Sequence, residues 1–208
     1  MSTVNQSTAY FAPVSYYALF LRYDRIVIEQ WCNYTKQTYR NRCHIAGANG
    51  LLALSVPIVK PDTIKCPTKD IRISDHGEWR HLHWNAIASA YGSSPFFEYY
   101  QDDIRPFFEK RYEFLLDFNE EIRRTVCNLI GLEPHIEYSS SYSEPAPGET
   151  DLRDAIHPKR RKAETILPVQ PKPYYQVFSE KYGFQPDLSI IDLLMNMGPE
   201  SILILQNT

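Results

Sequence analysis

The segment "YRNRCH", which begins at Tyr39, concentrates groups that could bind an anion or move a proton. On a strand the side chains alternate, so Arg40, Arg42 and His44 would share one face while Tyr39 and Asn41 share the other. Paired guanidiniums can hold a carboxylate or a phosphate through two hydrogen bonds each. The alternative is that these basic side chains protect an exposed edge strand from aggregation, and the pattern leaves both interpretations open.

The segment "EWRHLHW" carries two histidines at a spacing that predicts opposite helix faces. His83 shares the apolar face with Trp79 and Tyr91, whereas His81 points elsewhere, so the two cannot converge on one metal ion. A histidine on an apolar face is usually a hydrogen-bonded core residue. Its ordinary pKa of about 6.5 also suits proton transfer, so His83 and His44 are the two candidate catalytic bases.

The segment "TDLRDAIHPK" crowds charged side chains between prolines, inside a stretch from 143 to 172 that lacks periodicity. Its members are Arg153, Asp154, His157 and Lys159. A solvated loop whose charges pair with one another is one interpretation. The other is a lid that folds over the cationic face and excludes water from a transfer reaction.

The elements that must position these groups begin with a predicted strand over 8–13, a helix over 14–23 and a strand over 24–30. A parallel crossover is the simplest arrangement of the three. The run "YRNRCHIAGANGLLALSVPI" predicts a hairpin, because the glycines of "GANG" permit a tight turn. A further short strand is expected over 70–74.

Helical periodicity takes over from Glu78, with Gly92 as its end. Ser94 followed by Pro95 predicts the start of a second helix, and an amphipathic stripe predicts a long third helix from Pro106 to about residue 129. "HIEYSS" is expected to return to the sheet. We predict one α/β domain over residues 1–208, with a small mixed sheet from the N-terminal third covered by the helices of 78–130 and 187–205.

Composition narrows the classes of function. The chain of 208 residues has a formal charge of −3 and no long basic run, which argues against a nucleic-acid partner. It contains no apolar stretch of membrane-spanning length and no signal peptide, so we expect a cytoplasmic protein. The four cysteines form no C-x-x-C pair, which predicts reduced thiols and no metal site. No P-loop, G-x-S-x-G or G-x-G-x-x-G motif is present, and no cofactor is expected.

Four stretches in order resemble the WbqC-like protein family of bacteria. They are "AYFAP.SYYALF…DRIVIEQ", "YRNRCHI" before "GLLALSVPI", "W.HLHW.AI..AYG.SPFFEYY" and "F.PDLSIIDLLMNMGPES". Members of that family typically lie among genes for surface polysaccharide and O-antigen synthesis. The resemblance therefore implies a transferase that acts on an activated sugar or nucleotide-sugar, with acyl or aminoacyl (glycine) transfer as its candidate chemistry.

In that transferase, Arg42 and Lys36 would hold the anionic donor, Asn41 would orient the acceptor, and His83 or His44 would act as general base. Tyr39, Arg40, Trp79 and Tyr91 complete the expected binding residues for a small anionic or sugar-linked substrate. The alternative is a non-catalytic binding or scaffold protein of the same pathway, which uses its many tyrosines as an interface. The sequence leaves a homo-oligomer open.

Overall fold

Two short strands at the N-terminus form the centre of a parallel sheet in the computed structural model, which describes residues 1–63, 65–159 and 167–208. β1 (Thr3–Ser7) pairs with β2 (Arg25–Glu29) in register, and α1 (Val14–Ala18) with the 3₁₀ turn η1 (Leu19–Leu21) crosses between them. The predicted parallel crossover is confirmed.

The strand predicted over 8–13 is wrong, because the strand precedes it at Thr3–Ser7. Phe11 has a φ of 37°, a left-handed conformation that a strand cannot contain. The apolar side chains of Tyr10 and Phe11 are buried in the aromatic core instead of lying in the sheet. The run of apolar residues over 8–13 therefore reflects burial in the core and not a strand.

The outer strands of the parallel sheet come from much later in the chain. β5 (Ile136–Tyr138) pairs with β2, and β6 (Thr150–Asp151) pairs with β1, so the order is β5-β2-β1-β6. The predicted return of "HIEYSS" to the sheet is confirmed. β6 lies within the segment predicted as irregular surface from 143 to 172, and residues 160–166 of that segment lie outside the described residues.

The predicted hairpin is confirmed as a separate, antiparallel two-stranded sheet. β3 (Arg42–Gly47) pairs with β4 (Gly50–Ser55), and Gly50 turns with a φ of 102° that only glycine adopts readily. The expected mixed sheet of the N-terminal third is therefore two sheets. The strand predicted over 70–74 is a 3₁₀ turn, η2 (Thr68–Asp70), followed by isolated bridges from Arg72 and Ile73.

The helix predicted from Glu78 is confirmed as α2 (Trp79–Tyr91), whereas the next two differ from expectation. Ser94 does not start a helix, because its hydroxyl donates to the carbonyl of Tyr91 at the end of α2. The predicted long helix is interrupted, since residues 113–115 make backbone hydrogen bonds with residues 71–73. The helices of this region are α3 (Phe97–Ile104), α4 (Pro106–Glu109) and α5 (Leu115–Ile130).

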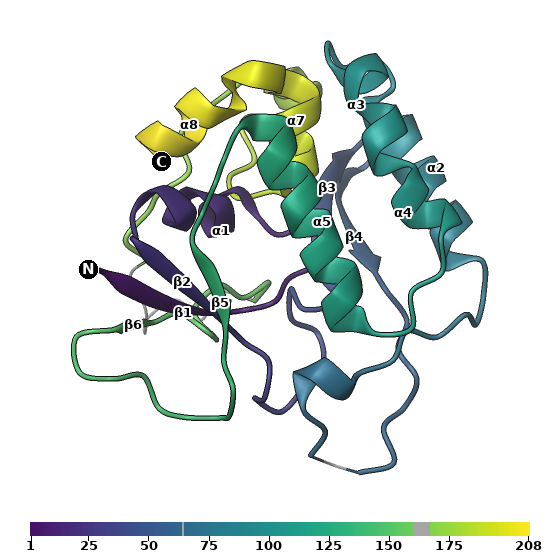
Figure 1. Ribbon diagram of the computed structural model, residues 1–208. Coiled ribbons are helices and arrows are strands. Elements are labelled where there is room, and N and C mark those ends of the chain that lie inside the picture. Colours follow the sequence, from purple (N-terminus) through teal and green to yellow (C-terminus); the bar gives the residue numbers. More distant parts are fainter. Residues whose placement is uncertain (64, 160–166) are drawn as a thin grey trace.

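The region 187–205, predicted as helical, contains two α-helices, and the first ends at Gly198, whose φ is 55°. The elements are α6 (Ser179–Tyr182), α7 (Ile190–Met197), η3 (Gly198–Glu200) and α8 (Ser201–Asn207). Figure 1 shows α5 passing between the parallel sheet and the hairpin, with α7 and α8 above α1. The α/β class and the single domain are confirmed.

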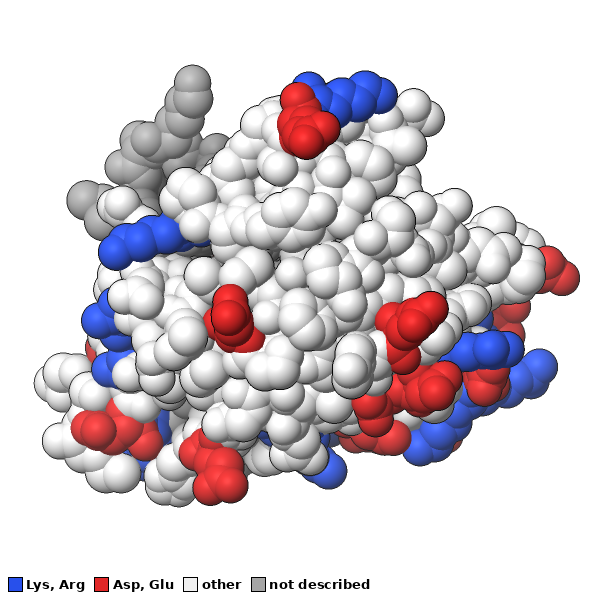
Figure 2. All heavy atoms as spheres, turned by 90° about the horizontal axis from the view of Figure 1, so that it is seen from above, with Lys and Arg blue, Asp and Glu red and all other residues white. Residues whose placement is uncertain are grey.

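The face above α7 and α8 carries few charged side chains. Figure 2 shows it as a mainly uncharged surface, with isolated acidic residues on the face and charged side chains of both signs around its edge. Leu203 of α8 is 52% exposed. A nucleic-acid partner requires a basic patch, and this face offers none.

Candidate functional site

The carboxyl ends of the parallel strands place several polar side chains at one edge of the sheet. β1 ends at Ser7, β2 at Glu29 and β6 at Asp151. From β1 the strands follow in sequence to one side, β2 and then β5, whereas β6 lies on the other side of β1. Open α/β sheets usually bind ligands at the carboxyl edge where the strand order reverses in this way. A narrow pocket, here the edge pocket, opens at this point between the end of β1 and the turn at 152–156.

Arg40 is the cation of the edge pocket, and its side chain is only 4% exposed. One terminal nitrogen, Nη2, donates to Ser7 Oγ at 2.7 Å and pairs with Asp154 Oδ1 at 3.3 Å. The Nε–H is buried and has no acceptor among the described residues. An unpaired buried donor costs free energy, so a ligand oxygen that supplied the missing acceptor would be favoured.

The far wall of the pocket contains a second unpaired polar group. The hydroxyl of Tyr16 is buried with no partner in the described chain, and burial raises the pKa of Tyr16 well above its ordinary value. Beside it, Glu120 Oε1 accepts from the hydroxyl of Thr8 at 3.1 Å, and Oε2 accepts from Arg123 Nε at 2.7 Å. The wall therefore offers a neutral hydroxyl, with a buried carboxylate directly behind the lining residue Thr8.

The turn at 152–156 covers the pocket. Arg153 makes two hydrogen bonds to Asp151, at 2.9 and 2.7 Å, and approaches Glu29 at 3.8 Å. The hydroxyl of Ser7 donates to the carbonyl of Arg153, which fastens the turn to β1. The enclosed space is about 20 Å³, enough for about one water molecule, so a larger ligand requires this turn to move.

Four of the residues predicted from the sequence meet at the edge pocket. Tyr39, Arg40 and Arg153 line it, and Asp154 reaches it through its ion pair with Arg40. This placement agrees with the expected lid, whose role stays a prediction. His157 lies beyond the lining, where its Nδ1 accepts from the backbone N–H of Lys159.

Other residues of the motif "YRNR" do not line the pocket. Arg42 donates from Nε to Ser55 Oγ at 2.9 Å on the hairpin, and Asn41 donates to the carbonyl of Val56 at 2.8 Å. Lys36 is exposed. Arg40 precedes β3, which begins at Arg42, so strand alternation does not relate the two guanidiniums as predicted.

The remaining candidates are placed in the core. His83 is 6% exposed, its Nδ1 bonds the hydroxyl of Tyr10 at 2.9 Å, and burial lowers the pKa of His83 to about 4. Trp79 packs edge-on against His83 with ring centroids 5.1 Å apart. Tyr91 donates to Asp192, as described below. These three side chains line neither of the pockets described here.

His44 touches a residue of the edge pocket, because its ring packs edge-on against Tyr39, which lines the pocket. Burial and the neighbouring charge of Arg42 lower the pKa of His44 below its ordinary value. The lowered pKa favours the neutral ring, the form that can accept a proton.

Sequence reasoning missed Ser7, Thr8, Tyr16, Glu29 and Glu120. The ends of predicted strands are the signal that could have found Ser7 and Glu29, and misplacing the first strand by a few residues hid Ser7. Glu120 was indistinguishable from a solvent-facing helix residue because its partners Thr8 and Tyr138 lie far away in sequence.

Neither a metal nor a membrane span is indicated by the described chain. Within residues 1–63, 65–159 and 167–208, no three histidine, cysteine or acidic side chains cluster as metal ligands would. Over the same ranges, no helix is both long and apolar enough to cross a bilayer. All four cysteines are free thiols.

Comparison with known proteins assigns the chain to a family. The pattern of the WbqC-like protein family matches residues 6–175, which contain the whole edge pocket. The chain belongs to this family. It is also 25% identical to the uncharacterized protein Rv1507c of Mycobacterium tuberculosis (strain ATCC 25618 / H37Rv), an alignment that covers 89% of each chain. No solved structure matches this WbqC-like protein significantly.

Proposed function

We propose that this WbqC-like protein is a transferase that acts on an activated sugar or nucleotide-sugar in bacterial surface polysaccharide synthesis, by acyl or aminoacyl transfer. The observation that carries the proposal is the buried Arg40 guanidinium, whose Nε–H lacks an acceptor at the carboxyl edge of the parallel sheet. A phosphate or carboxylate oxygen of the substrate would complete it. The polysaccharide context follows from what the family resemblance implies.

The turn at 152–156 gives the proposed site a way to open and close. Asp154 is 82% exposed and pairs with Arg40 Nη2 at 3.3 Å, so an anion that bridged Nε and Nη2 would compete with its carboxylate. Substrate would displace Asp154, and return of the turn would exclude the water that hydrolyses an activated donor.

For proton transfer, we assign the general base to Glu120 acting through the hydroxyl of Thr8, because Thr8 lines the pocket and donates a hydrogen bond to Glu120 Oε1. His44 is the second candidate, since its neutral ring touches Tyr39. A non-catalytic binding protein of the same pathway is the alternative, and it would bind substrate without turnover.

The test compares the two arginines of one motif in a thermal-shift titration with nucleotide-sugars, starting with UDP-glucose. Ligand binding raises the melting temperature by mass action. Arg40→Lys keeps the charge but lacks the planar fork, so we expect about ten- to a hundredfold weaker binding. Arg42→Lys is the matched control and should retain the response. An intact response in Arg40→Lys, or absence of any response in the native protein, would contradict the proposal.

A further inference from the structure

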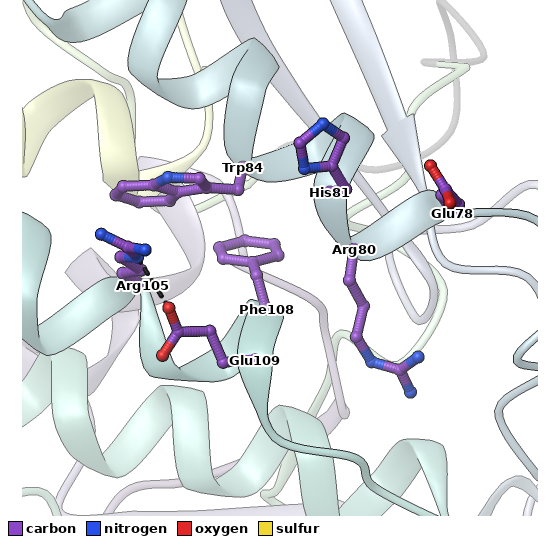
Figure 3. A pocket seen from close by; sticks show the side chains of 7 residues that line it. All are labelled: Glu78, Arg80, His81, Trp84, Arg105, Phe108 and Glu109. Carbon is purple, nitrogen blue, oxygen red and sulfur yellow. Dashed lines mark hydrogen bonds and ion pairs between the residues drawn. The ribbon is translucent and has the colours of Figure 1, made fainter.

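We propose that a surface groove between α2 and α4 is a binding site for a neutral saccharide. The groove, here the α2–α4 groove, is lined by the N-terminal half of α2 and by residues around α4 (Figure 3). Its volume is about 530 Å³, within the range of about 300–1,000 Å³ typical of small-molecule sites. It shares no lining residue with the edge pocket, so this inference does not depend on the proposed function.

Aromatic rings form the apolar part of the groove. Trp84 and Phe108 pack with ring centroids 6.0 Å apart, and Trp84 also stacks on Phe97 at 6.0 Å. These contacts hold the indole in place before any ligand arrives. The indole N–H groups of Trp31 and Trp79 donate to backbone carbonyls, whereas that of Trp84 has no acceptor in the part of the chain that the structure describes.

Charged side chains at the rim balance one another. Arg105 donates from Nε to Glu109 Oε1 at 2.7 Å, an ion pair visible in Figure 3. Arg80 pairs with Asp75 at 2.7 Å, and Glu78 also lines the groove. Two guanidiniums therefore face at least two carboxylates, and no net field selects for an anion or a cation.

A neutral sugar matches this combination better than other small molecules. The C–H face of a pyranose ring is apolar and packs against an aromatic surface, while its hydroxyls both donate and accept hydrogen bonds. Glu109 and Glu78 offer acceptors, and Arg105 offers donors. Arg105 pairs with Glu109, and Arg80 pairs with Asp75 through Nη1 only. Nε and Nη2 of Arg80 are buried without a partner among the described residues, and a sugar hydroxyl can accept from such donors.

The test follows the three tryptophan indole N–H signals by NMR during titration with the neutral disaccharides lactose, maltose and cellobiose. We expect the Trp84 signal to shift saturably with at least one of them, while the Trp31 signal stays in place. Adenosine and glucuronic acid serve as aromatic and anionic comparators. No shift at Trp84 with any disaccharide, or tighter binding of either comparator, would overturn the proposal.

Two substitutions give an independent readout by calorimetry with the best disaccharide. Trp84→Ala should weaken binding at least about fivefold through loss of the stacking surface, whereas Trp31→Ala should leave it unchanged. Glu109→Gln changes a side chain that is 60% exposed and therefore leaves the fold intact, and it should also weaken binding about fivefold. Unchanged affinity in both groove variants would refute a saccharide site there.

Discussion

Two regions of this molecule bury polar side chains, but only one of them supplies hydrogen-bond partners for all the groups compared here. Around Asp192 on α7 both carboxylate oxygens are satisfied, since Oδ1 accepts from Tyr91 and Oδ2 accepts from Tyr174 and Gln176. At the edge pocket, by contrast, neither the Nε–H of Arg40 nor the hydroxyl of Tyr16 has a hydrogen-bond partner among the described residues.

The contrast separates a structural network from a candidate binding site. The Asp192 cluster joins α7, the end of α2 and the segment at 174–176, and the hydroxyl of Tyr91 also accepts from the backbone of Ala46 in β3. Every partner there is protein, so the cluster contributes stability. The unpaired groups of the edge pocket can form hydrogen bonds with a ligand.

The largest effect should follow from breaking the satisfied network. Asp192→Ala removes the acceptor of the Tyr91 and Tyr174 O–H groups and of one Gln176 N–H in the core, so we expect the free energy of unfolding to fall by about 2–4 kcal/mol, measured by urea denaturation. Tyr16→Phe is the control, because it removes a hydroxyl that has no partner among the described residues and should change stability by less than about 0.5 kcal/mol. Equal losses of unfolding free energy in the two variants would contradict the distinction between a satisfied network at Asp192 and unpaired groups at the edge pocket.

A smaller effect should appear in the pH dependence of stability. Burial raises the pKa of Asp192 to about 6, above its ordinary value, although its three hydrogen-bond donors oppose the shift. The folded state therefore holds a proton that the unfolded state has released, and Asp192 disfavours folding progressively as pH rises from 4 to 6. Relative to Asp192→Asn, the native protein should gain about 1 kcal/mol between pH 7 and pH 5.

Urea denaturation of both proteins at the two pH values measures this difference. Groups whose pKa is lowered by ion pairs, such as Asp75 and Asp151, contribute equally to both proteins and cancel. Parallel stability curves for the two proteins would mean that Asp192 titrates normally.

The smallest effect concerns the cover of the edge pocket. If Asp154 competes with an anionic substrate for Arg40, Asp154→Asn should strengthen binding of UDP-glucose by about two- to fivefold, since exposed ion pairs contribute little. Isothermal titration calorimetry measures the change, with Asp102→Asn on the exposed face of α3 as control. Weaker binding in Asp154→Asn would mean that this carboxylate helps to hold the ligand.

The local pattern of residue types predicted most of the helices and strands. The predictions that failed concern segments whose structure depends on pairing with residues far away in the sequence. Helical periodicity from Glu78 and the glycines of the hairpin turn act within a few residues, and both predictions are confirmed. β6 has only two residues and exists because β1 offers an open edge, so no local signal marks it. The interruption of the long helix likewise depends on hydrogen bonds to residues 71–73.

The candidate site was likewise predictable where residue type alone sufficed and unpredictable where it depends on long-range pairing. Arg40 and Arg153 were identified from residue type, yet their convergence depends on β6 pairing with β1. The predicted equivalence of Arg40 and Arg42 failed because Arg40 lies before the strand begins. Tyr91 and His83 were chosen for chemistry but have partners within the core, and sequence does not report which polar groups find partners.

The most direct measurement of the central claim observes the arginine Nε–H groups by NMR during titration with UDP-glucose. The unpaired Nε–H of Arg40 should shift saturably as a phosphate oxygen completes its hydrogen bonding. The Nε–H of Arg42, which already donates to Ser55 at 2.9 Å, should stay in place and serves as the internal control. A ligand that binds and shifts the Arg42 signal, or neither signal, would contradict an anion site at Arg40.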